Sequence, residues 1–277
     1  MNNIPLKIVY EDAHIIVIEK REGLLSVGTR SAREEVTAHS LLNNYVKNTA
    51  DSRAYKRERG YQANRGRWQR NGQPNCQQQP NRQQQPNRQQ PRIFIVHRLD
   101  RETSGLMVFA KSEEIKRILQ DNWDQIVTQR KYVAVVNGIP QAEEGTFRSW
   151  LKENSAYIVY SSPRNNGGQL AITHFKVLEN NTKKQKSLVE FELETGRKNQ
   201  IRVHAQEMGF PLYGDKKYYG EHQAILQENK KARRLYLHAY ILDFIHPVTG
   251  KEMKFTTGIP HNFYREIKNI QSEGGKS

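Results

Sequence analysis

The sequence predicts an α+β fold built around an extended, mainly antiparallel sheet. Most apolar segments are short and alternate with polar residues, which is typical of strands. Helical segments are few and irregularly spaced, so the regular alternation of strand and helix that builds a parallel sheet is missing. A glycine-rich phosphate-binding loop is missing as well, so the sequence indicates no nucleotide cofactor.

The first expected elements precede a polar loop near the middle of the chain. Residues 7–10 (KIVY) and 15–19 (IIVIE) alternate on either side of a short polar turn, as in a hairpin. Residues 38–46 (AHSLLNNYV) have helical spacing. Residues 92–96 and 106–110 are apolar enough to form buried strands that flank the loop.

The second half of the chain continues the strand pattern at residues 131–137, 146–151, 172–178 and 188–195. Residues 199–208 have helical spacing, and Gly209 is a suitable C-terminal stop for that helix. Residues 235–244 alternate until the break at His246-Pro247. Residues 262–270 are expected to form a final helix.

The chain carries a large excess of positive charge. Lys and Arg total 44 against 29 Asp and Glu, which gives a net charge of +15. Such an excess attracts polyanions, of which nucleic acid is the usual one. An anionic membrane surface is the weaker interpretation, because no basic amphipathic helix stands out.

Residues 51–92 differ in composition from the rest of the chain. They hold almost no aliphatic residue and repeat the letters QQQPNR. Such a segment cannot bury enough apolar surface to offset chain entropy, so we expect a disordered Arg/Gln/Asn/Pro-rich insertion within a single domain of residues 1–277. Its ten Lys or Arg and two acidic residues give it a net charge of +8. An arm that grips RNA and a surface loop without a role are both consistent with this composition.

Other features of the composition restrict the class of protein. The single cysteine, Cys76, excludes an internal disulfide framework and a zinc site built from several thiolates. No stretch approaches the roughly 20 apolar residues that a membrane-spanning helix needs. The N-terminus does not have the pattern of a signal peptide. We therefore expect a cytoplasmic protein, with a monomer as the default oligomeric state.

A dense polar segment, HRLDRETSG, separates the apolar residues 92–96 from residues 106–110. A loop between buried strands would hold the Asp100 carboxylate on a rigid support beside a cleft. The guanidinium groups of Arg98 and Arg101 would keep that carboxylate ionised, as a nucleophile requires. Taken alone, the segment is at least as well explained by a turn in which Asp100 is only a turn former.

The string HRLDRETSGLMVFAKS resembles the central motif of the RluA-type family of RNA pseudouridine synthases, in which HRLD precedes two variable residues and TSG. Other segments resemble family elements in the same order: VYEDAHIIVIEKREGLLS before the motif, and QRKYVAVVNG, GRKNQIRVHAQEMGFPLYGDKKYYG and LHAYILDFIHPVTG after it. The resemblance covers nearly the whole chain outside the insertion. It implies the pseudouridine synthase fold, in which a mainly antiparallel mixed sheet with flanking helices surrounds a central RNA-binding cleft.

The resemblance also implies a reaction. Family members isomerise specific uridines of structured RNA, either 23S ribosomal RNA, transfer RNA or both. The glycosidic bond breaks, the base rotates and a new bond forms at carbon 5. No cofactor and no metal are therefore expected. The target base must leave its stem before it can react, which requires base flipping.

Individual roles follow from the family motif. The catalytic aspartate matches Asp100, the active-site tyrosine matches Tyr132, and the arginine that pairs with the aspartate matches Arg202. Asp100 could attack the uracil ring or the anomeric carbon, or abstract a sugar proton. Tyr132 would stack under the ring and could remove the carbon 5 proton. Arg98 would replace the flipped base in the RNA stack, and Ile201 would form an apolar wall. The remaining residues expected to bind substrate are Arg197, Gln200 and Thr103.

Three features depart from the family pattern. Lys198-Asn199 stands where relatives usually have Thr-His. Because asparagine still donates and accepts hydrogen bonds, we expect an altered supporting contact. Lys20-Arg21 stands where Lys-Pro is common, which is expected to affect the loop and not the reaction. No S4-like RNA-binding domain is expected before the core, so the core or the insertion would have to dock the substrate.

Two other functions are less well supported by the sequence. A metal-dependent hydrolase would gather His97, Asp100, His204 and His238 as ligands, but their spacing matches no metal-binding motif. A non-catalytic RNA-binding or chaperone protein would use the Arg/Gln-rich segment and would not need Asp100. The combination of Asp100, Tyr132 and Arg202 favours the synthase over both.

Overall fold

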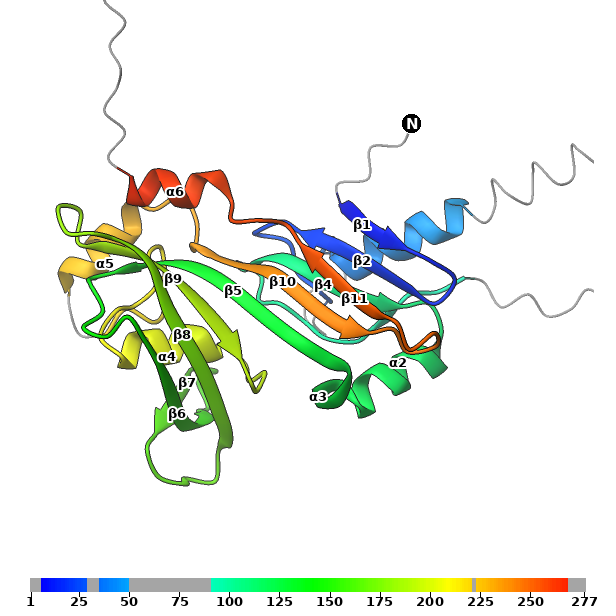
Figure 1. Cartoon of the computed structure of the whole chain (residues 1–277), viewed down its shortest axis with the longest axis horizontal. Coiled ribbons are helices and arrows are strands. Elements are labelled where there is room, and N and C mark those ends of the chain that lie inside the picture. Colours follow the sequence, from blue (N-terminus) through cyan, green and yellow to red (C-terminus); the bar gives the residue numbers. More distant parts are fainter. Residues whose placement is uncertain (1–5, 29–34, 50–90, 221–222, 269–277) are drawn as a thin grey trace, which may run out of the picture.

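The computed structural model describes residues 6–28, 35–49, 91–220 and 223–268. Residues 51–90 of the expected insertion lie outside these ranges. One helix, at residues 38–49, carries no label in Figure 1. The labelled elements are β1 (Lys7–Glu11), β2 (Ile15–Lys20), β3 (Phe94–Ile95), β4 (Ser104–Ala110), α2 (Glu113–Asp121), α3 (Trp123–Ile126), β5 (Val127–Asn137), β6 (Glu144–Glu153), β7 (Val159–Ser162), β8 (Gln169–Asn181), β9 (Lys186–Leu193), α4 (Gln200–Glu207), α5 (Gln223–Lys231), β10 (Leu237–Ile245), β11 (Glu252–Thr256) and α6 (His261–Ile267).

The described strands form one sheet of 11 strands that runs the length of the molecule (Figure 1). Its main order is β1-β2-β4-β10-β5-β9-β8-β6-β7, with β3 added to β4 and β11 added to β10. The pairs are antiparallel except β4 with β10, which run parallel. The predicted α+β class with a mainly antiparallel mixed sheet is therefore confirmed.

Helices cover both faces of the first half of the sheet. On one face, Leu42 of the helix at residues 38–49 packs in a core with Phe109 of β4. On the other face, Leu119 of α2 packs with Val108 of the same strand. Because successive side chains of a strand point to opposite faces, β4 is buried along its whole length and supports the loop that precedes it.

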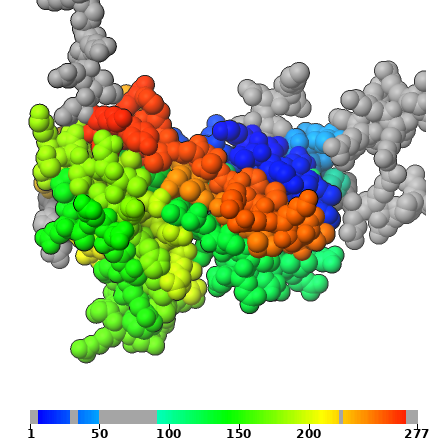
Figure 2. Space-filling model, in the orientation of Figure 1, coloured from blue at the N-terminus to red at the C-terminus, as the bar shows by residue number. Residues whose placement is uncertain are grey.

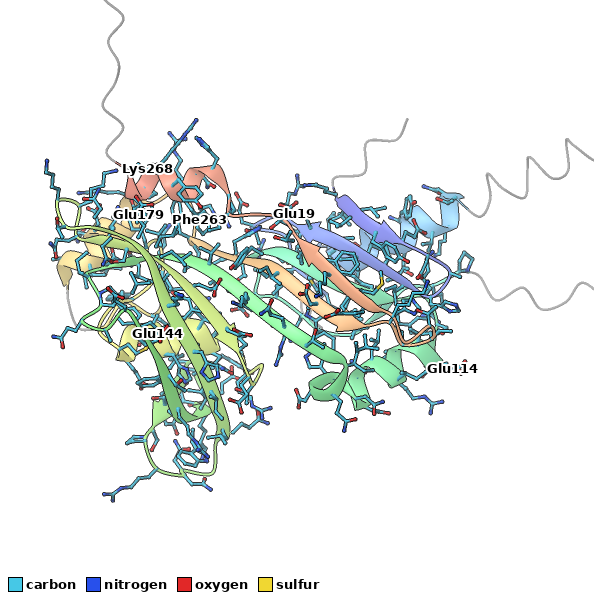
Figure 3. All side chains as sticks on the ribbon, in the orientation of Figure 1. Glu19, Glu114, Glu144, Glu179, Phe263 and Lys268 are labelled. Carbon is cyan, nitrogen blue, oxygen red and sulfur yellow. The ribbon has the colours of Figure 1, made fainter. Side chains whose placement is uncertain are left out.

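The second half of the sheet is covered in the same way. Ile201 of α4 packs with Phe191 of β9 on one face. Phe263 of α6 packs with Val135 of β5 in a separate core. The ring of Phe263, labelled in Figure 3, lies 5.2 Å from that of Tyr236, just before β10, in an edge-on contact.

Most predicted elements are confirmed, but one is wrong in extent and five were not predicted. The strand expected at residues 92–96 has only two residues, Phe94–Ile95, and these are half-buried. Helices α2, α3 and α5 and strands β7 and β11 were missed. Helix α2 has a start signal that could have been used, because the Ser112 hydroxyl accepts from the Ile115 N–H at 3.2 Å as an N-cap.

Strands β6 and β7, with the adjoining end of β8, project from the sheet as an arm (Figure 1). Helices α2 and α3 project at the same margin of the molecule, and its outline is hollowed between the arm and the helices (Figure 2). No helix in the described ranges is both long enough and apolar enough to cross a membrane.

Candidate active site

Asp100 lies in the loop between β3 and β4, and residues 20–26 hold the backbone on both sides of it. Ser26 Oγ donates to the Leu99 carbonyl at 2.7 Å and accepts from the Leu99 N–H at 3.1 Å. On the other side of Asp100, the carbonyl of Arg101 accepts from the Gly23 N–H at 2.9 Å. The position of the Asp100 carboxylate is therefore set by a segment that is remote in sequence.

Lys20 is a second support that sequence reasoning missed. Its side chain is fully buried, and Nζ donates to the carbonyls of Leu24 at 2.8 Å and Arg101 at 3.2 Å. Burial lowers the Lys20 pKa to about 8, while the charge of Asp100 opposes that change. The departure at Lys20-Arg21 therefore lies directly beneath the loop of Asp100. The resemblance of the opening hairpin was the available signal for Lys20.

A cavity of about 70 Å³ lies beside Asp100. It adjoins a larger cavity of about 430 Å³, and both are lined by Arg98, Tyr132, Leu193 and Arg197. The smaller cavity has room for roughly two water molecules, and exposed Arg98 lies on its wall. The structure brings all the predicted site residues to this small cavity: Arg98, Asp100, Thr103, Tyr132, Arg197, Gln200, Ile201 and Arg202.

The predicted ion pair of Arg202 with Asp100 is present as a long one, and Arg202 has two further carboxylate partners. Arg202 makes its close ion pair with Asp215, through Nε to Oδ2 at 2.7 Å and Nη2 to Oδ1 at 2.8 Å. Its Nη1 lies 3.2 Å from a Glu102 carboxylate oxygen and 3.9 Å from Asp100 Oδ2. The fork of a guanidinium favours the bidentate partner, and Asp215 occupies that place.

Asp215 is a site residue that sequence reasoning did not single out. Its side chain is fully buried, and Oδ1 also accepts from the backbone N–H groups of Lys217 at 2.8 Å and Tyr218 at 2.9 Å. The Tyr218 ring lies 5.1 Å from the Arg202 guanidinium. The Gly-Asp and Tyr-Gly elements of the motif resemblance were the signal for this cluster. Asp215 fixes Arg202 so that its third nitrogen faces Asp100.

Burial dominates the ionisation of Asp100. It raises the Asp100 pKa above the ordinary value of 3.8, and the charges of Arg202 and Arg98 oppose this only in part. The expected effect of Arg98 has the predicted direction, because its charge lowers the Asp100 pKa, although burial outweighs it. The exposed Arg101 guanidinium instead reaches the Gly23 carbonyl at 3.2 Å and Glu35 at 3.5 Å.

Tyr132 lies on β5, opposite Ala239 of β10 and Phe191 of β9. Burial raises the Tyr132 pKa to about 12, and the charge of Asp100 acts in the same direction. The phenol is therefore neutral at physiological pH in the free protein. A neutral ring in the cavity wall suits stacking against a base better than proton abstraction.

Gln200 has a supporting position in the structure. Its Oε1 accepts from Thr195 Oγ1 and from the Arg197 N–H, both at 2.9 Å. Its Nε2 donates to the Ile172 carbonyl and to Thr173 Oγ1, both at 2.9 Å. These four bonds use the hydrogen-bonding capacity of the amide, so Gln200 holds the cavity wall without a free group for a substrate.

Asn199 makes the supporting contact that the sequence predicted. It has a left-handed backbone, with φ of 55°, and precedes the first residue of α4. Its Nδ2 donates to the Tyr218 hydroxyl at 3.0 Å, and the same hydroxyl accepts from the Val159 N–H at 3.0 Å. Asn199 thereby joins the cavity wall to the arm.

The histidines of the alternative metal site are engaged elsewhere. The His97 ring stacks against Trp123 at 4.7 Å and its Nε2 accepts from the Val108 N–H at 3.1 Å. His204 bonds to hydroxyl groups of β6 and β8, and His238 bonds to those of Ser104 and Thr257. Within the described ranges, no group of three or more His, Cys, Asp or Glu side chains could hold a metal ion.

The chain is similar to known proteins over most of its length. A family model described as RNA pseudouridylate synthase matches residues 14–207. YhcT of Bacillus subtilis, named an uncharacterized RNA pseudouridine synthase, is 40% identical over 158 residues, which are 56% of this chain and 49% of YhcT. YlyB of the same organism is 38% identical over 65% of this chain and 56% of its own length. The chain thus spans about half of the length of these two relatives.

Longer alignments exist with other proteins. The ribosomal large subunit pseudouridine synthase D of Pseudomonas aeruginosa is 31% identical over 273 residues, which are 94% of this chain and 70% of that protein. Among solved structures, human RNA pseudouridylate synthase domain containing 4 aligns with a TM-score of 0.63 at 23% identity, over 94% of this chain and 91% of that chain. At this identity the structural match supports the fold.

Proposed function

Because the chain belongs to the RNA pseudouridylate synthase family, we propose that it isomerises uridines in structured RNA to pseudouridine, with Asp100 as the essential carboxylate. The observation that carries the proposal is the position of Asp100. Its half-buried carboxylate shares one small cavity with Tyr132, Ile201 and Arg202, although these residues come from separate elements.

Large-subunit ribosomal RNA is the substrate class that we favour. The relative in Pseudomonas aeruginosa is named a ribosomal large subunit pseudouridine synthase, and its alignment covers 94% of this chain and 70% of that protein. Transfer RNA is the second class to test, because the cavity has no described feature that distinguishes the two. The described surface around the cavity carries exposed cations, including Arg98 and Arg197, which suit phosphate contacts in either RNA.

The chemistry requires a flipped uridine to reach Asp100. The carboxylate then attacks the ring or the anomeric carbon, or removes a sugar proton. The ion pair with Asp215 keeps Arg202 charged. The charged Arg202 in turn stabilises the ionised Asp100 carboxylate, whose Oδ2 lies 3.9 Å from Arg202 Nη1. Tyr132 stacks against the base as a neutral ring. No residue in this scheme changes its oxidation state, and the atoms of the uridine are all retained.

The other cavity residues would hold the substrate in distinct ways. Exposed Arg98 is suited to fill the gap that the flipped base leaves in the RNA stack. Arg197 donates from Nε to the Leu170 carbonyl at 2.9 Å and retains other donors for a phosphate. Buried Ile201 and Thr103 shape the wall.

The test is a transcriptome-wide map of pseudouridine in cells with the gene intact, deleted, or restored as Asp100→Ala. Sites that vanish on deletion and do not return with the variant would establish the activity, the carboxylate and the substrate together. Sites that return with Asp100→Ala would refute the role of Asp100. A map that is unchanged by deletion is followed by purified protein on ribosomal and transfer RNA transcripts, where absence of product favours a non-catalytic RNA-binding protein.

A further inference from the structure

The turn that joins β6 to β7 displays a group of large apolar side chains to solvent. Tyr157 is 73% exposed, and Ile158 and Tyr160 are each 42% exposed. The other exposed large hydrophobic residues in the described ranges are scattered singly along the chain: Val9, Val36, Leu178 and Val248. A local group of exposed apolar side chains at the end of a projecting arm is typical of an interaction surface.

The turn holds Tyr157 in a fixed and unusual conformation. Tyr157 has φ of 58°, in the left-handed region that glycine or asparagine adopts at lower cost. Asn154 secures this geometry, because its Oδ1 accepts from the N–H groups of Ala156 and Ile158 at 3.0 Å and its carbonyl accepts from the Tyr157 N–H at 3.0 Å. A strained residue with an exposed ring is better explained by binding than by stability of the turn.

Two lysines lie against Tyr157. Lys217 Nζ donates to the Tyr157 carbonyl at 2.8 Å, and Lys198 Nζ lies 5.8 Å from the centre of the Tyr157 ring. Both lysines are exposed, and Lys198 Nζ also forms an ion pair with exposed Glu153. Lys152 at the end of β6 is exposed as well. Positive charge beside an exposed aromatic ring is the combination that proteins use to bind unpaired nucleotides, through phosphate contacts and base stacking.

The turn is continuous with the wall of the catalytic cavity. Lys198 lies between Arg197 and Asn199, which both line that cavity. The Tyr218 hydroxyl accepts from Asn199 of the cavity wall and from Val159 of the arm, so the two parts are joined by one side chain. An RNA strand that leaves the cavity over Lys198 therefore meets the Tyr157 ring.

We propose that Tyr157 stacks against an unpaired nucleobase that flanks the target uridine, with Lys198 and Lys217 beside the adjoining phosphates. The location of this subsite rests on the proposed function, whereas the binding that it predicts does not require catalysis. A protein partner would also use exposed apolar residues, but the cations and the continuity with the cavity favour RNA.

The probe is a ten-nucleotide oligouridylate that contains one 2-aminopurine, whose fluorescence falls when the base stacks. Affinity and fluorescence are measured with the full chain and with Tyr157→Ala, Tyr157→Gly and Tyr157→Phe. We expect Tyr157→Phe to behave as the parent, and the other two to bind about tenfold more weakly with loss of the fluorescence change. The matched control is Leu178→Ala, since Leu178 is 41% exposed and adjoins Glu179 at the end of β8 remote from the arm (Figure 3).

Tyr157→Gly separates binding from folding. Glycine relieves the left-handed backbone, so its melting temperature should equal or exceed that of the parent protein while RNA affinity falls. Unchanged affinity in Tyr157→Ala and Tyr157→Gly, or an equal loss in Tyr157→Phe, would overturn the stacking role.

Pseudouridine formation in ribosomal RNA transcripts is measured in parallel. Product from the parent with an unchanged KM in Tyr157→Ala would overturn this inference alone. Absence of product from the parent would refute the proposed function and leave the binding series to decide the role of Tyr157.

Discussion

The carboxylate of Asp100 must be ionised to attack a base or a sugar, yet it lies where ionisation is costly. Burial raises its pKa, and the three cations that oppose burial, Arg202, Arg98 and Lys198, act from outside hydrogen-bonding distance or from an exposed position. Titratable groups with such conflicting surroundings are concentrated at functional sites. The residue is therefore maintained at a cost to the folded state, and that cost can be measured.

Asp100→Asn should abolish product formation and increase the stability of the protein at neutral pH. A carboxyl group whose folded pKa is raised destabilises the native state once it ionises. Stability is therefore lost as pH rises from the ordinary value of 3.8 through the raised folded pKa. Urea unfolding of both proteins at neutral and mildly acidic pH should show a gain that shrinks on acidification. A variant that is less stable at neutral pH would contradict the direction of this pKa.

Arg202 contacts the carboxylates of Asp215 and Glu102, and substitution of these two residues should change the stability of the protein by different amounts. Asp215→Asn leaves Arg202 buried without its bidentate partner, which should cost about 3 kcal/mol of unfolding free energy and most of the activity. Glu102→Gln is the control, because Glu102 is half-exposed at 3.2 Å from the same guanidinium and should change stability by less than about 1 kcal/mol. Equal losses of unfolding free energy in Asp215→Asn and Glu102→Gln would show that Asp215 does not hold Arg202 more strongly than Glu102 does.

At the scale of elements, the sequence predicted strands and helices where a periodic pattern was strong. The strand predicted at residues 15–19 and the helix predicted at residues 199–208 are followed closely by β2 and α4, although β2 is buried on both faces and does not alternate. Strand β11 was missed although its five residues, EMKFT, alternate between polar and apolar. Helix α5 was missed because its polar residues gave no apolar stripe.

The site could be predicted as a set of residues but not as a set of pairs. The motif placed Asp100 and Arg202 in one cavity, which the structure shows. It could not show that Asp215 is the bidentate partner, since the choice between two carboxylates depends on distances of about one ångström. The sequence also could not predict that the Asp100 pKa is raised, because the burial that raises it arises from packing among elements that are remote in sequence.

The close packing of β4 against β10 is a testable feature of the fold. A Cβ at Gly105 would lie 2.1 Å from the Ala239 carbonyl oxygen, and the Gly105 φ of +121° is unsuited to other residues. Gly105→Ala should therefore lower the unfolding free energy by about 3 kcal/mol or more. Gly250→Ala, with φ of +67° and no atom near its Cβ, should cost only about 1 kcal/mol in the same urea experiment. Similar losses of unfolding free energy in Gly105→Ala and Gly250→Ala would indicate that β4 and β10 separate easily at Gly105.

At the scale of the whole molecule, charge is divided between residues 51–92 and the rest of the chain. The net charge of that segment, +8, is about half of the +15 of the chain. Deletion of residues 53–90 should leave single-turnover chemistry intact and weaken RNA binding, because nonspecific affinity follows the number of phosphate contacts. Affinity measured over a range of salt should have a shallower slope after deletion. An unchanged slope and affinity would show that the segment does not contact RNA.

The position of β10 in the middle of the sheet has a consequence for the order in which the protein folds during synthesis. Strand β10 is translated late, yet it lies between β4, which carries the loop of Asp100, and β5, which carries Tyr132. A ribosome-bound chain that ends before Leu237 therefore holds two sheet fragments with open edges, which are prone to pair with other chains. The two sides of the cavity come together only in one late step of synthesis, when β10 joins the fragments.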